Sequence, residues 1–327
     1  MGEIDITKLK CTIKMMLASK EVLDITGLCI AVAWGDEKDS IAQKAEITLA
    51  NIKIKQGYLS DLIELCTQVY IYVNKKEYFR GTVWDWNYVS GLEKELSFTA
   101  YDKMIYLTQS KENAYYSSGK STQFLIEDIC SQWGISVDYQ WESWTHGKTP
   151  LKDMAISQQI TSILDEAQTK LDSKYVMLME QDILKIRKKG SNEEVYYFHG
   201  KNVESTTNHL TLQSLVTKVL IVGKSEEDKR PPVLATVDGL VEYGILQEIV
   251  TKDSNKTLED ANKEAQNILK EKGKPEETIS VITVDVPMLR KGDKIKLVAG
   301  NLSGYFYIVG VSHDGMTKAM EMELERI

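Results

Sequence analysis

The C-terminal stretch, residues 277–327, has the hydrophobic pattern of an antiparallel β-meander. Apolar and polar side chains alternate strictly near its end, and its earlier segments are rich in β-branched and aromatic residues. Glycine stands beside asparagine, aspartate or serine between the segments, as tight turns require. The predicted strands span residues 278–286, 294–298, 305–311 and 320–327.

The stretch 66–100 repeats this order of strands much earlier in the chain. Any two antiparallel meanders share an order of strand and turn, so the pattern alone leaves open whether the two stretches are copies of one β-module. If they are copies, three chains together would present six modules. The matched segments are 45–49 with 278–284, 69–73 with 295–299, 78–83 with 305–311, and 95–100 with 320–324.

The residues between the two stretches have a different pattern, with helical periods. A helix is predicted from Ser121 or Thr122 to about residue 133, and a second, amphipathic helix spans 156–171. A hairpin is predicted over 174–187, turning at Gln181 and Asp182. Residues 108–119 show no apolar period, so we expect a polar connector there.

Strand patterns return at residues 210–222, which we expect to complete the second β-module. Pro231 and Pro232 then interrupt the pattern, since proline cannot donate to a strand ladder. Thr257 is predicted to cap a helix that ends before Gly273. The second module is therefore expected in two pieces, with a helical excursion between them.

These patterns predict an α+β fold that is dominated by β-structure: two antiparallel β-barrels in one chain, with a small α+β domain between them. The expected domains are a first barrel at 1–109, a central domain at 110–202, and a second barrel at 203–327. The second barrel is expected to carry its helical insertion at about 241–276.

Composition excludes several classes of partner. Forty-eight acidic residues against 40 basic ones give a net charge of −8, which argues against a general nucleic-acid binder or a protein held on an anionic membrane by charge. We expect no sequence-specific nucleic acid among the partners. No apolar run is long enough to span a membrane, and no secretory signal is recognisable, so we expect synthesis and assembly in the cytoplasm. Four scattered cysteines without a CxxC pattern fit a reducing compartment.

A phosphate-binding loop is imitated by Gly119, Lys120 and Ser121, which precede the first central helix. Such a loop needs a glycine where this chain has Ala114, so that consecutive amides can turn toward the phosphates. We therefore interpret Ser121 as part of a helix N-cap and expect no nucleotide cofactor.

Neither histidines nor carboxylates form a recognisable catalytic pattern. The four histidines lack metal-ligand spacing, and His146, which stands near Trp141 and Trp144, is more typical of aromatic packing than of catalysis. Adjacent carboxylates occur at 127–128 and 165–166, but neighbours on a helix point to different sides. Glycoside hydrolysis by such a pair stays an alternative, and we expect no metal site, no cofactor and no enzyme.

Tryptophan side chains could instead bind carbohydrate or bases, and Trp84 and Trp86 are predicted to share one strand face around Asp85. Base stacking would need basic residues between the rings, so core or interface packing is favoured. The C-terminal strand has a similar alternation: Met320, Met322 and Leu324 face one side, and an acidic row faces the other. That row consists of Glu321, Glu323 and Glu325.

Four segments carry a resemblance to a known family: 96–107 (LSFTAYDKMIYL), 121–130 (STQFLIEDIC), 289–297 (LRKGDKIKL) and 304–313 (GYFYIVGVSH). They resemble the XkdQ/YqbQ family, which comprises tail proteins of contractile phages, defective prophages and phage-tail-like bacteriocins. These motifs are diffuse structural patterns and contain no chemical signature. The resemblance extends over nearly the whole chain.

The resemblance implies a structural baseplate hub, similar in role to the T-even phage hub and to late control protein D. Such a hub is a homotrimer whose tail-tube-like barrels form a pseudo-six-fold ring between the tail tube protein and the central spike protein. Other baseplate proteins and the tape-measure protein are further expected partners, and the finished protein is expected in the baseplate.

In such a ring the acidic row of Glu321, Glu323 and Glu325 would face the lumen and repel DNA, whereas a solvated outer face is the simpler interpretation. A tail-associated cell-wall hydrolase or a peptidoglycan-binding module is the alternative function.

Overall fold

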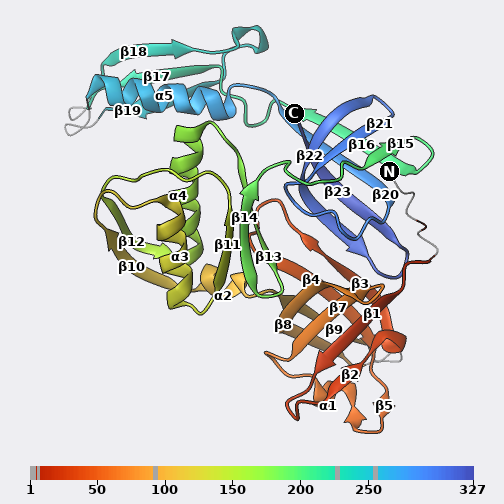
Figure 1. The fold of residues 1–327 in the computed structure, drawn as a ribbon. Helices are drawn as coiled ribbons and strands as arrows, with labels where there is room; N and C mark the ends of the chain where they lie inside the picture. Colours follow the sequence, from red (N-terminus) through yellow and green to blue (C-terminus); the bar gives the residue numbers. More distant parts are fainter. Residues whose placement is uncertain (1–4, 6–7, 91–94, 225–228, 253–256) are drawn as a thin grey trace. The chain divides into compact units, whose positions relative to one another are not determined.

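A computed structural model describes residue 5 and residues 8–90, 95–224, 229–252 and 257–327. The chain divides into two compact units. The larger unit comprises Met1–Thr206 and Ser280–Ile327, and the smaller one comprises Thr207–Ile279. Among the described residues, no helix is both long enough and apolar enough to cross a membrane. Figure 1 labels most of the helices and strands named below.

Most of the described strands belong to one 13-stranded sheet. Its main path runs β16-β20-β23-β22-β3-β4-β9-β8-β7-β1-β2, and β21 joins β22 and β15 beside this path. The strands from the N-terminal part are β1 (Cys11–Met16), β2 (Val22–Asp24), β3 (Cys29–Asp36), β4 (Gln43–Ala50), β7 (Gln68–Val73), β8 (Lys76–Val89) and β9 (Glu95–Tyr101). Those from the C-terminal part are β15 (Tyr197–His199), β16 (Val203–Thr211), β20 (Glu276–Val284), β21 (Lys294–Ala299), β22 (Leu302–Asp314) and β23 (Ala319–Arg326).

The order of strands occurs twice in this sheet. The C-terminal part has the order β16-β20-β23-β22-β21, and the N-terminal part has the order β3-β4-β9-β8-β7. Four of the five positions hold strands that the sequence comparison matched, namely β20 with β4, β23 with β9, β22 with β8 and β21 with β7. The structure adds a fifth pair, β16 with β3, and the internal repeat is confirmed at the level of strand order. The two parts meet where β22 pairs antiparallel with β3, from Val311 opposite Asp36 to Asp314 opposite Ala33.

Alternation along the strands explains the two cores of this sheet. Leu96, Phe98 and Ala100 of β9 are buried, as their spacing predicts, while the residues between them are half-buried. In β23, the side chains of Met320 and Met322 are buried in the same way. Small elements fill the loops: the 3₁₀ turn η2 (Thr26–Leu28), β5 (Lys53–Ile54), β6 (Gly57–Tyr58) and α1 (Leu59–Leu62).

The central part of the chain is an α+β region with its own apolar core. Its elements are α2 (Met104–Gln109), β10 (Lys111–Tyr116), α3 (Thr122–Gln132), β11 (Ser136–Gln140), β12 (Thr149–Ala155), α4 (Ile156–Leu171), β13 (Tyr175–Glu180) and β14 (Ile183–Lys188). Helices α3 and α4 pack together with the sheet β11-β14-β13, as expected. The expected polar connector instead contains β10, because β10 pairs with β12, a partner distant in sequence.

The smaller unit corrects the expected second module. Its elements are β17 (Lys218–Val222), β18 (Val233–Asp238), η3 (Val241–Tyr243), β19 (Gln247–Thr251) and α5 (Leu258–Lys272). We expected residues 210–222 to complete that module, but β17 lies in a separate sheet between β18 and β19. Ala261 and Ala265 of α5 pack on Val219 and Val250, so this unit buries its own core and is larger than the insertion expected at 241–276. Thr257 caps α5 through Asp260, as expected.

Candidate functional site: a buried polar junction

A buried ion pair joins the two parts of the large sheet. Asp36 ends β3, and Arg290 lies in the loop between β20 and β21. The Arg290 Nε atom donates to Asp36 Oδ2 at 2.6 Å, and Nη2 donates to Oδ1 at 2.8 Å. Both side chains are less than 10% exposed. This two-point contact fixes the orientation of both groups, since a guanidinium and a carboxylate are planar.

The lysine that follows holds the loop after β3. The backbone N–H of Lys291 donates to Asp36 Oδ2 at 3.2 Å. Its Nζ atom donates to the carbonyl oxygens of Glu37, Lys38 and Ser40 at 2.9, 2.6 and 3.0 Å. Burial lowers the pKa of Lys291. Two consecutive residues of the C-terminal part therefore determine the path of the chain between β3 and β4.

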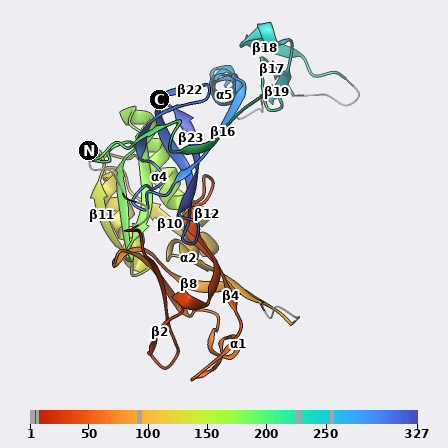
Figure 2. The same ribbon diagram turned by 90° about the vertical axis from the view of Figure 1, so that its right-hand side faces the viewer.

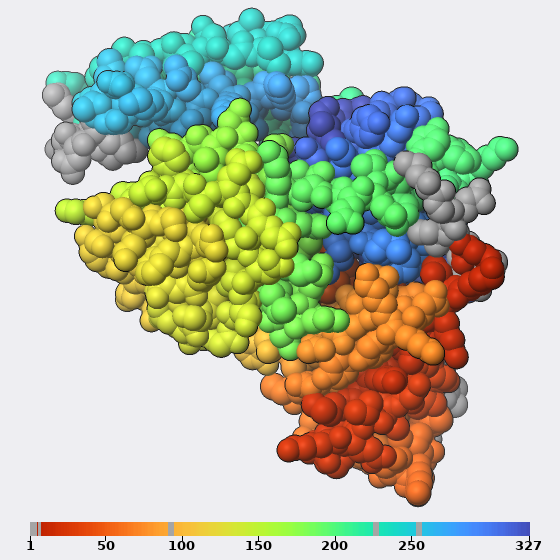
Figure 3. Space-filling view, viewed as in Figure 1, coloured from red at the N-terminus to blue at the C-terminus, as the bar shows by residue number. Residues whose placement is uncertain are grey.

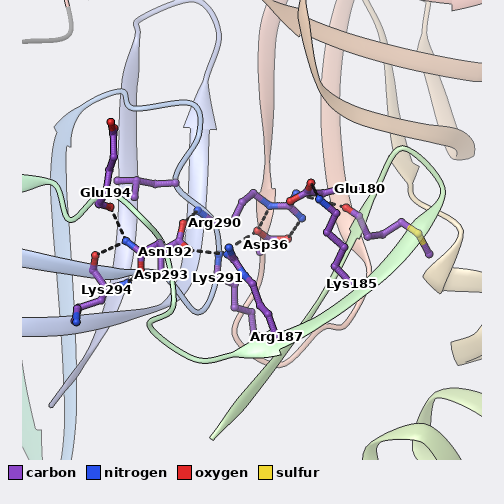
Figure 4. A network of polar contacts seen from close by, with 12 residues as sticks. Asp36, Glu180, Lys185, Arg187, Asn192, Glu194, Arg290, Lys291, Asp293 and Lys294 are labelled. Atoms are coloured by element: carbon purple, nitrogen blue, oxygen red, sulfur yellow. Dashed lines mark hydrogen bonds and ion pairs between the residues drawn. The ribbon is translucent and has the colours of Figure 1, made fainter. Parts of the chain in front are cut away.

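The hairpin of β13 and β14 is attached to the same junction. Arg187 of β14 donates to Asp293 Oδ1 at 2.6 Å, and the Arg290 N–H donates to Asp293 Oδ2 at 2.9 Å. Asn192 exchanges two hydrogen bonds with the backbone of Lys294, at 2.7 and 2.9 Å. Figure 4 shows these residues between the ribbons of the three regions. In Figure 3, the segment that follows β14, in green, lies against the blue C-terminal part.

The N-terminal part contacts the hairpin through Arg80 of β8. Its Nη1 atom donates to Asp182 in the β13–β14 turn at 3.2 Å, and its Nε atom donates to Glu77 at 2.9 Å. The turn itself has the predicted form, since Gln181 and Asp182 both have positive φ. Three segments that are far apart in sequence are thus joined by charged hydrogen bonds.

The electrostatics of the junction depend on burial. For Asp36, burial by itself raises the pKa, but the Arg290 guanidinium and the N–H of Lys291 together hold this pKa below its usual value. Burial raises the pKa of nearby Asp102 to about 7, although its carboxylate accepts from the N–H groups of Gln43 and Met104. Asp36 is therefore held charged by a cation in contact with it, whereas Asp102 has no such partner among its hydrogen bonds.

A cavity of about 260 Å³ lies beside the junction, and the acids Glu77 and Glu180 are among the residues that line it. Glu77 accepts from Arg80, and Glu180 accepts from Lys185 at 2.6 Å. Burial raises the pKa of Glu180, but Lys185 outweighs this effect and lowers it. A general acid of a glycosidase needs a raised pKa, so Glu180 has the wrong electrostatics for that role. The geometry favours rigid attachment of three regions to one another.

Comparison with known proteins agrees with this architecture. A family model described as YQBQ-like matches residues 32–326. The chain belongs to the YQBQ-like family. It is 23% identical over 221 residues to the uncharacterized protein YqbQ of Bacillus subtilis, which covers 66% of this chain and 67% of that protein. The expected family is thereby confirmed.

Solved structures share the fold. The 43 kDa tail protein of prophage MuSo2 from Shewanella oneidensis aligns with a TM-score of 0.71 at 12% identity, covering 97% of this chain and 98% of that chain. A tail protein from Neisseria meningitidis aligns with a TM-score of 0.69 at 10% identity, covering 96% of each chain. A type VI secretion component from Escherichia coli, described as structurally similar to T4 tail proteins, aligns with a TM-score of 0.53 at 10% identity, covering 91% of this chain and 74% of that chain.

The predicted acidic row has three different environments. The alternation itself is confirmed, because Met320, Met322 and Leu324 are buried between the acids. Glu321 is exposed and Glu323 is half-buried. Glu325 forms ion pairs with Lys174 and Lys189 at 2.7 and 2.5 Å. Burial alone raises the pKa of Glu325, but the two lysines lower it. Glu325 therefore ties β23 to the central region.

His146 lies in an arrangement that resembles a catalytic triad. Its Nδ1 atom lies 2.9 Å from Glu166 Oε2, and its Nε2 atom lies 2.9 Å from Thr122 Oγ1. The Thr122 hydroxyl also accepts from the N–H of Trp144 at 3.0 Å, and it is fully buried. A nucleophile must reach substrate, so this hydroxyl cannot act as one. His146 is itself buried and held by these two hydrogen bonds, and its expected aromatic packing near Trp141 and Trp144 stays a prediction.

The other sequence candidates have structural partners. The Ser121 hydroxyl accepts from the N–H of Phe124, which confirms the N-cap interpretation. Tyr116 donates to Asp128, and Tyr175 donates to Asp165. Within the described residues, no group of three potential ligands could hold a metal ion.

Trp84 and Trp86 are 37% and 38% exposed, which excludes core packing for both. Asp36 and Arg290 were missed by sequence reasoning, because nothing local pairs residues so far apart.

Proposed function

We propose that this chain is a structural hub subunit of a phage-tail or tail-like baseplate. The observation that supports this best is the repeated strand order, with the two repeats locked by Asp36 and Arg290. Two repeats that are held rigidly within one chain present two similar surfaces in a fixed relative position. The tail proteins and the secretion component that share this fold agree with the proposal.

The finer proposal is a homotrimer. The domains 1–109 and 203–327, the latter apart from the separate sheet β18-β17-β19 and helix α5, act as tail-tube-like barrels. Three chains arrange them as six similar positions around a channel. One face of this ring meets the hexameric tail tube protein, and the other carries the trimeric central spike. The central domain, 110–202, contacts other baseplate proteins. The chain assembles in the host cytoplasm and ends in the baseplate.

Within the ring, we place the acidic row toward the channel. Glu321 and Glu323 carry this role, because Glu325 already pairs with two lysines. Negative charge on the wall would keep DNA and the tape-measure protein from adhering. A structure of the assembled ring with Glu321 on its outer rim would overturn this placement.

A cell-wall hydrolase or a peptidoglycan-binding module is the other candidate class. The buried Thr122 hydroxyl and the ion-paired Glu180 speak against hydrolysis at the two most site-like places. If the central region were a binding module, the full chain would sediment with purified peptidoglycan. We propose a role without catalysis.

Negative-stain microscopy and light scattering of the full chain, alone and with its spike protein, test the proposal. The expected result is a particle with the mass of three chains and a central channel. If the protein remained a monomer both alone and in the presence of the spike, the hub function would be refuted.

A further inference from the structure

The pairing of β22 with β3 shows how two modules of this chain join. The last four residues of β22, from Val311 to Asp314, pair antiparallel with the end of β3. His313 lies opposite Trp34, and their rings stack with centroids 5.3 Å apart. Both side chains are buried, with exposures of 0% and 2%. The edge of one module is thus closed by the first strand of the next module.

The equivalent edge of the N-terminal module is open. Strand β8 occupies the position that β22 has in the other module, and its pairing with β7 stops at Thr82. Beyond that point, residues 85–89 pair with β9 alone, among the residues that the structure describes. Figure 2 shows this end of the β8–β9 hairpin, in orange, extending away from the other strands.

Apolar side chains mark this open edge. Trp84, Trp86 and Tyr88 are each 37–38% exposed, and Val89 is 57% exposed. A long edge strand with exposed aromatic side chains is a template for pairing with another chain, and monomeric proteins normally block such edges with charge, proline or a bulge. Asp85 is the one charged residue in 84–89. A bulge between Val83 and Asp85 lies at the start of the open part.

The complementary edge is strand β16, at the end of the sheet path. Strand β16 has the position in the C-terminal module that β3 has in the N-terminal one, and it ends the path of described strands. Its residues are exposed or half-buried along the whole strand. The chain therefore has one open edge, on β8, at the position where β22 pairs with β3. It also has one strand, β16, that corresponds to β3 and has no strand on its outer side among the described residues.

We infer that β8 of one copy pairs antiparallel with β16 of a second copy, repeating the β22–β3 junction between chains. The inference rests on the proposed hub function and assigns the edges through which that ring closes. A contact between two different edges is heterologous, so it continues from copy to copy until the ring closes. The occupant is a second copy because the chain already makes the same contact with itself.

Cysteine pairs test this contact in the full-length chain, with Cys66→Ser as the background because Cys66 is exposed. One chain carries Asn87→Cys or Tyr88→Cys, which lie on opposite faces of β8. The other carries a cysteine in place of Ser205, Thr207 or His209, three exposed residues of β16. Opposed residues on neighbouring strands have Cα atoms about 4.5–5.5 Å apart, which suits a disulfide.

The two chains, each with one introduced cysteine, are mixed at high concentration under mild oxidation, and the products are separated on a denaturing gel. The expected result is a disulfide-linked dimer that forms only from the mixture, and linked trimers when one chain carries both cysteines. Dimers from the β8 variant alone would overturn the inference in favour of a two-fold β8–β8 contact.

A second readout separates the two proposals. If microscopy shows rings while none of the six cysteine combinations forms a cross-link, the β8–β16 contact is wrong and the hub function stands. If the chain forms neither rings nor cross-links, with or without the spike protein, both are wrong.

Discussion

The guanidinium of Arg290 holds both carboxylate oxygens of Asp36, at 2.6 and 2.8 Å, although 254 residues separate the two in sequence. Asp36 stands at the end of β3, where the C-terminal module meets the N-terminal one. Within the larger unit, this ion pair links the place where β22 pairs with β3 to the loop that leads into β21. This buried ion pair therefore holds the two modules in a fixed position relative to each other.

Replacing one partner of this pair should destabilise the larger unit strongly. Asp36→Ala leaves the Arg290 charge buried without its partner, and such a change costs about 3–5 kcal/mol of unfolding free energy. Chemical denaturation measures this loss. The combination Asp36→Leu with Arg290→Met should recover much of it, since no buried charge remains.

A surface pair provides the matched control for that experiment. Lys44 and Glu46 form an ion pair at 2.9 Å in which the Glu46 side chain is 59% exposed. Glu46→Gln should change the unfolding free energy by no more than about 1 kcal/mol, because water screens exposed charges. Equal effects of Asp36→Ala and Glu46→Gln would show that the junction does not hold the modules together.

Asp102 should make stability depend on pH near neutrality. Burial raises the pKa of Asp102 to about 7 in the folded chain, against an ordinary value of 3.8. The folded state then binds the proton more tightly than the unfolded state does, so this group lowers stability as pH rises from about 4 to about 7. Asp102→Asn removes this contribution.

The measurement is the unfolding free energy of both proteins across that pH range. The wild-type chain should lose more stability between pH 5 and 7.5 than Asp102→Asn does, whatever their absolute difference. The comparison of slopes matters because asparagine cannot accept from both N–H groups as the carboxylate does. Parallel curves would mean that Asp102 titrates as an ordinary exposed acid.

Glu325 and Glu321 should respond differently to neutralisation. Glu325→Gln breaks the ion pairs with Lys174 and Lys189. It should lower the free energy of unfolding by up to about 1 kcal/mol, since the site is partly exposed. The free energy of unfolding of Glu321→Gln should lie within about 0.5 kcal/mol of the wild-type value, because Glu321 is exposed. Thermal unfolding of the two variants side by side checks this order, and a reversed order would contradict it.

The triad-like group around His146 should matter for stability and have no hydrolytic role. His146→Ala removes a partner of the buried Thr122 hydroxyl and of Glu166, with an expected loss of about 1–3 kcal/mol. Purified peptidoglycan should not be cleared by wild-type protein. Clearing by wild type that disappears in Glu166→Gln, a milder variant, would establish an enzyme instead.

Charge placed on the open edge of β8 should abolish self-association without unfolding the chain. Trp86→Glu combined with Tyr88→Glu changes two exposed side chains, so the thermal unfolding midpoint should move little. Light scattering should show loss of the oligomer. Val22→Glu on β2, the strand at the far end of the sheet path and 56% exposed, is the control that should still associate.

Local patterns predicted much of this molecule. The alternation in β9 and β23, the Ser121 and Thr257 caps, and the Gln181–Asp182 turn all depend on residues that are near each other in sequence. The repeat of strand order was also visible, because each repeat is a series of short-range signals in the same sequence. Such features are set by side-chain period and backbone preference, which act over a few residues.

Pairing between distant segments could not be predicted in this way. The strand expected at 210–222 went to a separate sheet because β18, β19 and the alanine stripe of α5 could give β17 a core of its own. The polar connector at 108–119 contains β10 because β12 was available as its partner. The sequence by itself determined most of the elements and the duplicated order of strands. Only tertiary structure decided which edges pair, that Asp36 meets Arg290, and that β8 keeps an open edge, because these contacts join residues whose distance in sequence carries no local signal.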